Sequence, residues 1–287
     1  MHSAGAISGG LFTFGADENQ RGYLGHGSAA IMLPSRVPVV GERFVAVATH
    51  SLHTLALTDL GHVYSFGHGD CGKLGHGDEA SLSRPRLIES LAEMQAVAIS
   101  AGEQHSLVLT DTGVVYSFGS GFNGKLGHGD QRSHAAPWPI GGALAHAVVS
   151  CLAAGTQHSL AATRSGRLHT FGNNAAGQLG HGTRDSELAP RAVDALRERI
   201  VQIAGGEHHS LAVDDAGACY SWGAGEARER TSSWLGGWLG HRSIEDELIP
   251  CRINALGSVR VIAVAAGSWH SLALADGGAI FSFGDGS

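Results

Sequence analysis

Histidine is the residue type in this chain that most suggests a chemical role. The sequence holds 18 histidines among 287 residues, and an imidazole can bind a metal ion or act as a general base. Ten of them recur in two patterns, one resembling His-Ser-Leu and one beginning Leu-Gly-His. The first pattern contains His53, His105, His158, His209 and His270, and the second contains His26, His76, His128, His181 and His241. Each pattern supplies one histidine per repeat, so its members are held apart. We predict structural roles, with bonds to backbone groups within or between repeats, and no metal site.

Serine beside histidine raises the alternative of a nucleophile and its base. Ser106, Ser159, Ser210 and Ser271 each directly follow a histidine. Neighbouring residues of a strand point to opposite faces, whereas a nucleophile and its base must lie within hydrogen-bond reach of each other. The pattern therefore predicts no catalytic triad.

Two glycine-rich segments, 67–72 and 119–124, match the G-x-G-x-x-G pattern of dinucleotide sites. No helical pattern follows either segment, so no helix N-terminus would meet a pyrophosphate. Both matches also fall at the same place in a repeat. We interpret them as loop turns and predict no cofactor.

An aromatic residue followed by glycine marks the repeat that positions these side chains. Successive copies are 51 to 53 residues apart, except for a last spacing of 61. The aromatic residues are Phe14, Phe66, Phe118, Phe171, Trp222 and Phe283. Each unit contains an apolar strand ending at glycine, a strand through His-Ser-Leu, a tight turn, a strand ending in Ser-Phe-Gly and a fourth strand. Four short strands per repeat, with no helical period, are typical of β-propeller blades.

Residues 102–129 combine G-x-x-H-S-L, D-x-G-x-x-Y-S-F-G and L-G-H-G in one repeat. These motifs resemble the repeats of the regulator of chromosome condensation (RCC) family, and the resemblance covers essentially the entire chain. It implies an all-β fold, a propeller of four-stranded blades similar to a seven-bladed ring. It does not decide function, because that family includes nucleotide exchange factors, ubiquitin ligase domains, a plant ultraviolet-B receptor and adaptors.

The length predicts an incomplete propeller. Seven blades would need about 360 residues, whereas the chain has 287. We predict five to five and a half blades in a single domain, residues 1–287, with periods 1–52, 53–104, 105–157, 158–208 and 209–269 and a partial period 270–287. Uncovered blade edges would favour self-association. A partner chain, further sequence or a smaller ring would each resolve them.

The loop between Gly223 and Leu239 departs from the repeat, and we predict that it binds a partner. It is about nine residues longer than its counterparts. It contains Arg228, Arg230, Trp234 and Trp238. Tryptophan and arginine are frequent interface anchors, and insertions into repeats often carry function. The alternative is that the tryptophans fold back onto the blade.

Charge and composition limit the other partners. The formal net charge is -7 and no run of lysine or arginine occurs, which argues against direct nucleic-acid binding. No apolar run approaches the roughly 18 residues of a membrane-spanning helix, so we expect no membrane contact. Four widely separated cysteines and a first segment unlike a leader peptide predict an intracellular protein of the cytoplasm or nucleus.

These observations favour a non-catalytic scaffold for protein partners, with no enzymatic activity of its own. The RCC resemblance implies one alternative, a guanine nucleotide exchange factor for a small Ran-like GTPase. It implies a second, the repeat domain of a larger ubiquitin ligase or kinase.

Overall fold

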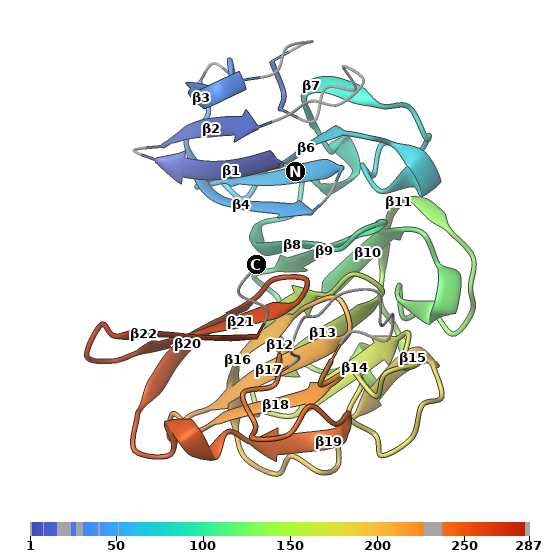
Figure 1. Ribbon diagram of the computed structural model, residues 1–287. Coiled ribbons are helices and arrows are strands. Elements are labelled where there is room, and N and C mark those ends of the chain that lie inside the picture. The colour runs from blue at the N-terminus through green and yellow to red at the C-terminus, as the bar shows by residue number, and fades with distance from the viewer. Residues whose placement is uncertain are drawn as a thin grey trace. The chain divides into compact units, whose positions relative to one another are not determined.

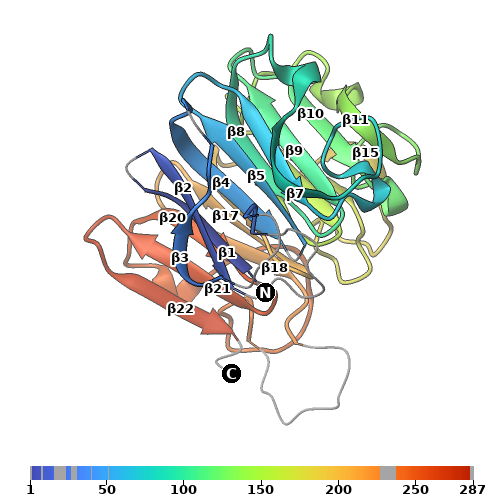
Figure 2. The same ribbon diagram turned by 90° about the horizontal axis from the view of Figure 1, so that it is seen from above.

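The computed structural model describes residues 2–7, 9–15, 24–26, 31–39, 41–50, 52–226 and 237–284. Within these residues the strands form six antiparallel sheets of three or four strands (Figures 1 and 2). The chain divides into two compact units, residues 1–122 with 131–141, and residues 123–130 with 142–287. The fold is an all-β propeller, and each sheet is one blade.

The first unit contains three blades, each with its strands in chain order. Blade 1 consists of β1 (His2–Ile7), β2 (Gly10–Gly15) and β3 (Ile31–Arg36). Blade 2 consists of β4 (Phe44–His50), β5 (His53–Thr58), β6 (Val63–Gly67) and β7 (Leu82–Leu87). Blade 3 consists of β8 (Ala96–Ala101), β9 (His105–Thr110), β10 (Val115–Gly119) and β11 (His134–Pro139).

The second unit contains the other three blades. Blade 4 consists of β12 (Val149–Ala154), β13 (His158–Thr163), β14 (Leu168–Gly172) and β15 (Glu187–Ala192). Blade 5 consists of β16 (Ile200–Gly205), β17 (His209–Asp214), β18 (Cys219–Gly223) and β19 (Glu247–Arg252). Blade 6 consists of β20 (Val261–Ala266), β21 (His270–Ala275) and β22 (Ile280–Gly284).

The second strand of a blade is its most buried element. Every residue of β5, β9, β13 and β17 is buried. A strand covered on both faces needs small or apolar residues at consecutive positions, and the His-Ser-Leu segments supply them. The outer strand β7 is only partly covered and carries two exposed arginines, Arg84 and Arg86. The core therefore lies between blades, and the histidines that begin these four strands lie inside it.

The glycine of Leu-Gly-His lets a loop of one blade pack closely on the next. Gly75 has a φ of +81°, and a Cβ there would lie 2.8 Å from the Phe118 ring. Gly180 has a φ of +78°, and its Cβ would lie 2.9 Å from Nε1 of Trp222. Only glycine satisfies both the left-handed backbone and the contact with the next blade's aromatic ring.

The predicted five to five and a half blades, counted against a seven-bladed ring, are wrong, because the described residues form six. The sequence periods were counted from the repeated histidine, which begins the second strand of a sheet. The apolar strand before it pairs with it in the same sheet, as Val261–Ala266 does with His270–Ala275. A boundary at residue 270 therefore divided the last blade between two periods.

Candidate functional site

The repeated histidines of the second strands bond serines of the following blade. Nε2 lies 2.9 Å from the serine Oγ in three pairs: His53 with Ser106, His158 with Ser210, and His209 with Ser271. These three histidines and His105 are fully buried, while His270 is exposed. The sequence suggested a backbone partner, but the partner is a side-chain hydroxyl.

Each of these serine hydroxyls also donates to a main-chain carbonyl. Ser106, Ser210 and Ser271 donate to the carbonyls of Lys73, Gln178 and Trp238 at 2.8, 2.8 and 2.9 Å. Because the serine proton is used in this bond, the serine oxygen accepts from the Nε2 proton of the histidine. Each hydroxyl thus bonds two parts of the preceding blade, the histidine of its second strand and the loop between its third and fourth strands.

A His–Ser pair at this distance has the geometry of a base and a nucleophile, but its environment opposes catalysis. The pair is buried, and the serine proton already has an acceptor. Burial lowers the pKa of His158 to about 3, with smaller contributions from the nearby His209 and His208. It lowers the pKa of His209 to about 4, assisted by His270 and His208. These groups hold blades together.

The histidines of Leu-Gly-His have a parallel role within a blade. Nε2 of His76 lies 2.8 Å from Oγ of Ser65, whose hydroxyl donates to the carbonyl of Leu74 at 2.6 Å. The same arrangement joins His181 to Thr170 at 3.0 Å. Burial, followed by the charge of Arg191, lowers the pKa of His181 to about 4. His128 lies at the equivalent loop position and is partly buried.

In blades 2 to 5 the residue before Leu-Gly-His is buried, although its chemical type differs from blade to blade. Lys73 is 1% exposed, Lys125 0%, Gln178 0% and Trp238 3%. Nζ of Lys125 donates to Oε1 of Gln157 at 2.8 Å. Trp238 packs with Ala176 and Ala224, and its ring centroid lies 6.3 Å from that of His209. Its indole therefore belongs to the core. Arg228, Arg230 and Trp234, the other predicted partner-binding residues, lie outside the described residues.

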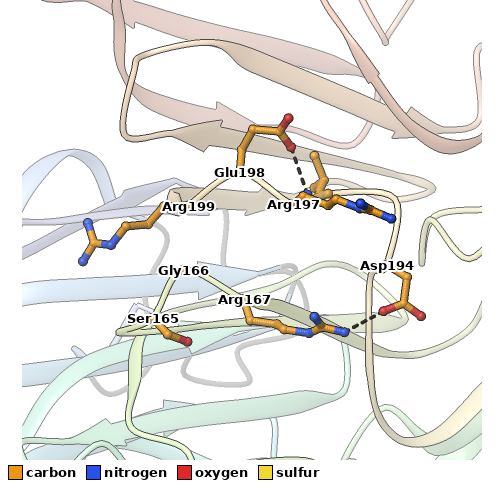
Figure 3. Close-up of a pocket in the computed structure, with 8 residues that line it drawn as sticks. Ser165, Gly166, Arg167, Asp194, Arg197, Glu198 and Arg199 are labelled. Atoms are coloured by element: carbon orange, nitrogen blue, oxygen red, sulfur yellow. Dashed lines mark hydrogen bonds and ion pairs between the residues drawn. The ribbon is translucent and has the colours of Figure 1, made fainter.

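A hollow lined by arginines lies on the surface of the second unit (Figure 3). It has a volume of about 520 Å³ and lies between the β13–β14 turn and the segment that joins β15 to β16. Its charged lining residues are Arg167, Asp194, Arg197, Glu198 and Arg199. Figure 3 shows Arg167 and Arg197 reaching toward the side of Asp194, while Arg199 extends the opposite way.

The ion pair in this hollow is exposed. Nη2 of Arg167 lies 2.6 Å from Oδ1 of Asp194, and the two side chains are 57% and 78% exposed. Such pairs contribute little stability. The Arg197 guanidinium is exposed, and only its backbone N–H has a described bond, to Glu198 at 3.0 Å. Arg167 and Arg197 are therefore accessible to an incoming anion.

A second, smaller hollow occupies the same place in the next blade. It has a volume of about 220 Å³, lies between the β17–β18 turn and the segment before β20, and contains Arg252 and Arg260. Arg260 donates to the carbonyls of Ala216 and Asp215 at 3.1 and 3.2 Å. In the first hollow Arg199 likewise donates to the carbonyl of Arg164 at 3.0 Å.

These arginines were not predicted from the sequence, although a signal was present. Arg43, Arg199 and Arg260 each stand one residue before the first strand of a blade. A Cβ on the turn glycine of the preceding blade would lie 2.7, 2.3 and 2.6 Å from their respective Cγ atoms, at Gly9, Gly166 and Gly217. The arginine side chain therefore crosses the bare backbone of the neighbouring turn. An alignment of the repeats at the residue before the first strand would have revealed the recurring arginine.

Within the described ranges, no three or more His, Cys, Asp or Glu side chains are placed to hold a metal ion. Over the same ranges, none of the helices has the length and apolar character needed to cross a bilayer.

Comparison with known proteins places these features in one family. A family model described as the RCC1-like domain matches residues 1–287. Human E3 ubiquitin-protein ligase HERC2 is 32% identical over 264 residues, which cover 90% of this chain and 5% of that protein. The ultraviolet-B receptor UVR8 of Arabidopsis thaliana is 33% identical over 288 residues, 99% of this chain and 63% of the receptor. The chain thus spans less than two thirds of these relatives.

A solved structure agrees with the fold. Prp20p from Saccharomyces cerevisiae superimposes with a TM-score of 0.80 at 23% identity, over 100% of this chain and 67% of that one. At this identity the likeness concerns the fold alone. Because the family model matches from the first residue to the last, this chain belongs to the RCC1-like domain family.

Proposed function

We propose that this chain is a non-catalytic scaffold that binds other proteins. The observation that carries the proposal is that the His–Ser pairs have a structural role between blades. They are the base and nucleophile candidates of the sequence, yet they are buried and their serine protons go to main-chain carbonyls. The sheets then serve as a rigid support, and recognition falls to the turns and loops between strands.

The lengthened loop remains a proposed contact element of this scaffold. Trp238 packs inside the blade, so the proposal there rests on Arg228, Arg230 and Trp234 and on their residue types alone. A partner identified by cross-linking and reconstituted at a defined stoichiometry would supply the assay.

A triple variant tests the loop against a matched control. Arg228→Ser, Arg230→Ser and Trp234→Ser together are expected to weaken the reconstituted complex about tenfold or more. The control, Arg84→Ser, Arg86→Ser and Trp138→Ser, removes the same residue types from exposed positions on β7 and β11. Equal affinities of the two variants would refute the loop assignment. Failure to form any stoichiometric protein complex would refute the scaffold.

Guanine nucleotide exchange is a second candidate. The favouring observation is the likeness to Prp20p, which was described together with its binding to Gsp1p and histones. Release of labelled GDP from a panel of small GTPases decides between the candidates. Accelerated release from any member would replace the scaffold proposal, and unchanged release from all of them would eliminate exchange.

A third candidate is a scaffold inside a larger ligase, since HERC2 matches over only 5% of its length. The mass of the native cellular protein tests it. A species far above 29.6 kDa would support this candidate, and a species of that mass would exclude it.

A further inference from the structure

The two basic hollows of the second unit contrast with the charge of the whole chain. The formal net charge is -7. The first hollow is lined by three arginines and two carboxylates, and the second by two arginines and no carboxylate. Positive charge is therefore concentrated at one repeated position of an acidic molecule. Local concentration of one sign of charge attracts ligands of the opposite sign.

The arginines in these hollows divide into two groups. Arg199 and Arg260 donate to main-chain carbonyls of the preceding turn, so they support the walls. Arg197 and Arg252 have exposed side chains with no described hydrogen bond or ion pair of their guanidinium groups. Arg167 pairs with Asp194 in an exposed contact, which an incoming carboxylate or phosphate can replace at little cost.

We propose that these hollows bind an acidic segment of a partner protein, with Arg167 and Arg197 holding one acidic side chain and Arg252 another. The proposal rests on the scaffold function and names the chemistry of its partner. The two hollows occupy the same position in consecutive blades. An extended segment whose acidic residues are spaced apart would place one acidic side chain in each hollow. Each arginine offers a planar fork of donors that matches a carboxylate or a phosphate.

The carboxylates of the site favour a peptide over a nucleic acid. Asp194 and Glu198 belong to the lining of the first hollow. The carboxylates would repel the closely spaced phosphates of a nucleic acid. A peptide can place its few acidic side chains beside the arginines and away from the carboxylates. The net charge of -7 opposes a polyanion further.

Fluorescence anisotropy with a labelled decapeptide of alternating glutamate and glycine tests the proposal on the full chain. Arg197→Gln and Arg252→Gln are each expected to weaken binding about fivefold, the factor expected for an exposed ion pair of ~1 kcal/mol. Asp194→Asn frees Arg167 and is expected to strengthen binding about twofold. A gain in affinity cannot arise from misfolding. A decapeptide with phosphoserine in place of glutamate shows whether phosphate serves as the anion.

Arg84→Gln is the matched control, because it removes the same charge from an exposed position on β7. The proposal is overturned if Arg197→Gln and Arg252→Gln bind like Arg84→Gln, if neither peptide binds, or if double-stranded DNA binds more tightly than both peptides at the same salt concentration. If the peptides fail while a reconstituted protein complex persists in all variants, the scaffold stands and this inference alone is wrong.

Discussion

The hydrogen bond between a buried histidine and the next blade's serine is the residue-scale feature with the clearest energetic consequence. In Ser210→Ala the Nε2 proton of His158 loses its acceptor inside the core. The carbonyl of Gln178 keeps a donor, Nε1 of Trp222 at 2.8 Å. One buried donor is thus left unsatisfied, and we expect the free energy of unfolding to fall by about 1–3 kcal/mol in urea denaturation.

Ser186→Ala is the control for this prediction, because Ser186 is an exposed serine in the loop before β15. Its free energy of unfolding is expected to match that of the unmodified chain within about 0.5 kcal/mol. If the two variants shifted the midpoint equally, the His–Ser pair would not hold the blades together.

Only part of this residue-scale chemistry was predictable from the sequence. Fixed spacing identified His158 and its equivalents as structural positions, since one member occurs in each repeat. It could not reveal that His158 meets Ser210, because that contact depends on how successive blades face each other. Burial of Lys73 and Lys125 was equally hidden, because lysine in a loop ordinarily predicts exposure.

At the scale of the element, the glycine three residues before the buried histidine of blades 4 and 5 is a steric requirement of the turn. A Cβ at Gly155 would lie 2.2 Å from Cε1 of His158 and 2.6 Å from the carbonyl oxygen of Gly206. Its φ is not in the left-handed region, so the collision alone opposes a larger residue. We expect Gly155→Ala to lower the free energy of unfolding by about 1–3 kcal/mol, measured by urea denaturation.

Two further variants separate this collision from a general glycine effect. Gly141→Ala places a methyl where no atom lies within 4 Å, so its stability should be unchanged. Replacing His158 by alanine as well should reduce the additional cost of Gly155→Ala, because the ring is the nearest obstacle. Strict additivity of the two substitutions would disprove the steric explanation.

The order of strands was predictable, whereas the boundaries of the sheets were not. Hairpin glycines and aromatic residues located the second and third strands of every complete repeat. The sheet begins one strand earlier, at apolar segments such as β8 and β20, which pair with the histidine strand that follows. These strands were expected from the sequence, but periods counted from the histidine assigned each of them to the preceding blade. In blade 2 the turn glycine is replaced by His50, and β4 continues so that His50 pairs with His53.

At the scale of the whole molecule, function followed from the sequence less directly than fold. Repeated motifs at fixed offsets identified the family that the RCC1-like model confirms over residues 1–287. The basic hollows were not identified, because arginines from a turn and from a distant linker converge there only in the folded chain. Because the surface is built from two segments that are separate in the sequence, no local sequence pattern indicates it.

Buried neutral histidines also give the whole molecule a predicted dependence on pH. The pKa of His158 is lowered from 6.5 to about 3 and that of His209 from 6.5 to about 4, in both cases chiefly by burial. Between about pH 6.5 and 4 the unfolded chain therefore binds protons that the folded chain excludes. Stability should be independent of these groups above pH 6.5 and should fall as the pH decreases below it.

The measurement is the free energy of unfolding in urea at intervals from pH 7.5 to pH 5, above the range in which most carboxylates titrate. As pH falls below 6.5, the slope attributable to each buried histidine should approach about 1.4 kcal/mol per pH unit. His158→Gln should reduce the slope because the group no longer titrates, whereas Ser186→Ala, which removes no titrating group from an exposed position, should leave it unchanged. A flat profile down to pH 5 would mean that the imidazoles take up protons without unfolding. The His–Ser bonds would then contribute less to blade cohesion than their burial indicates.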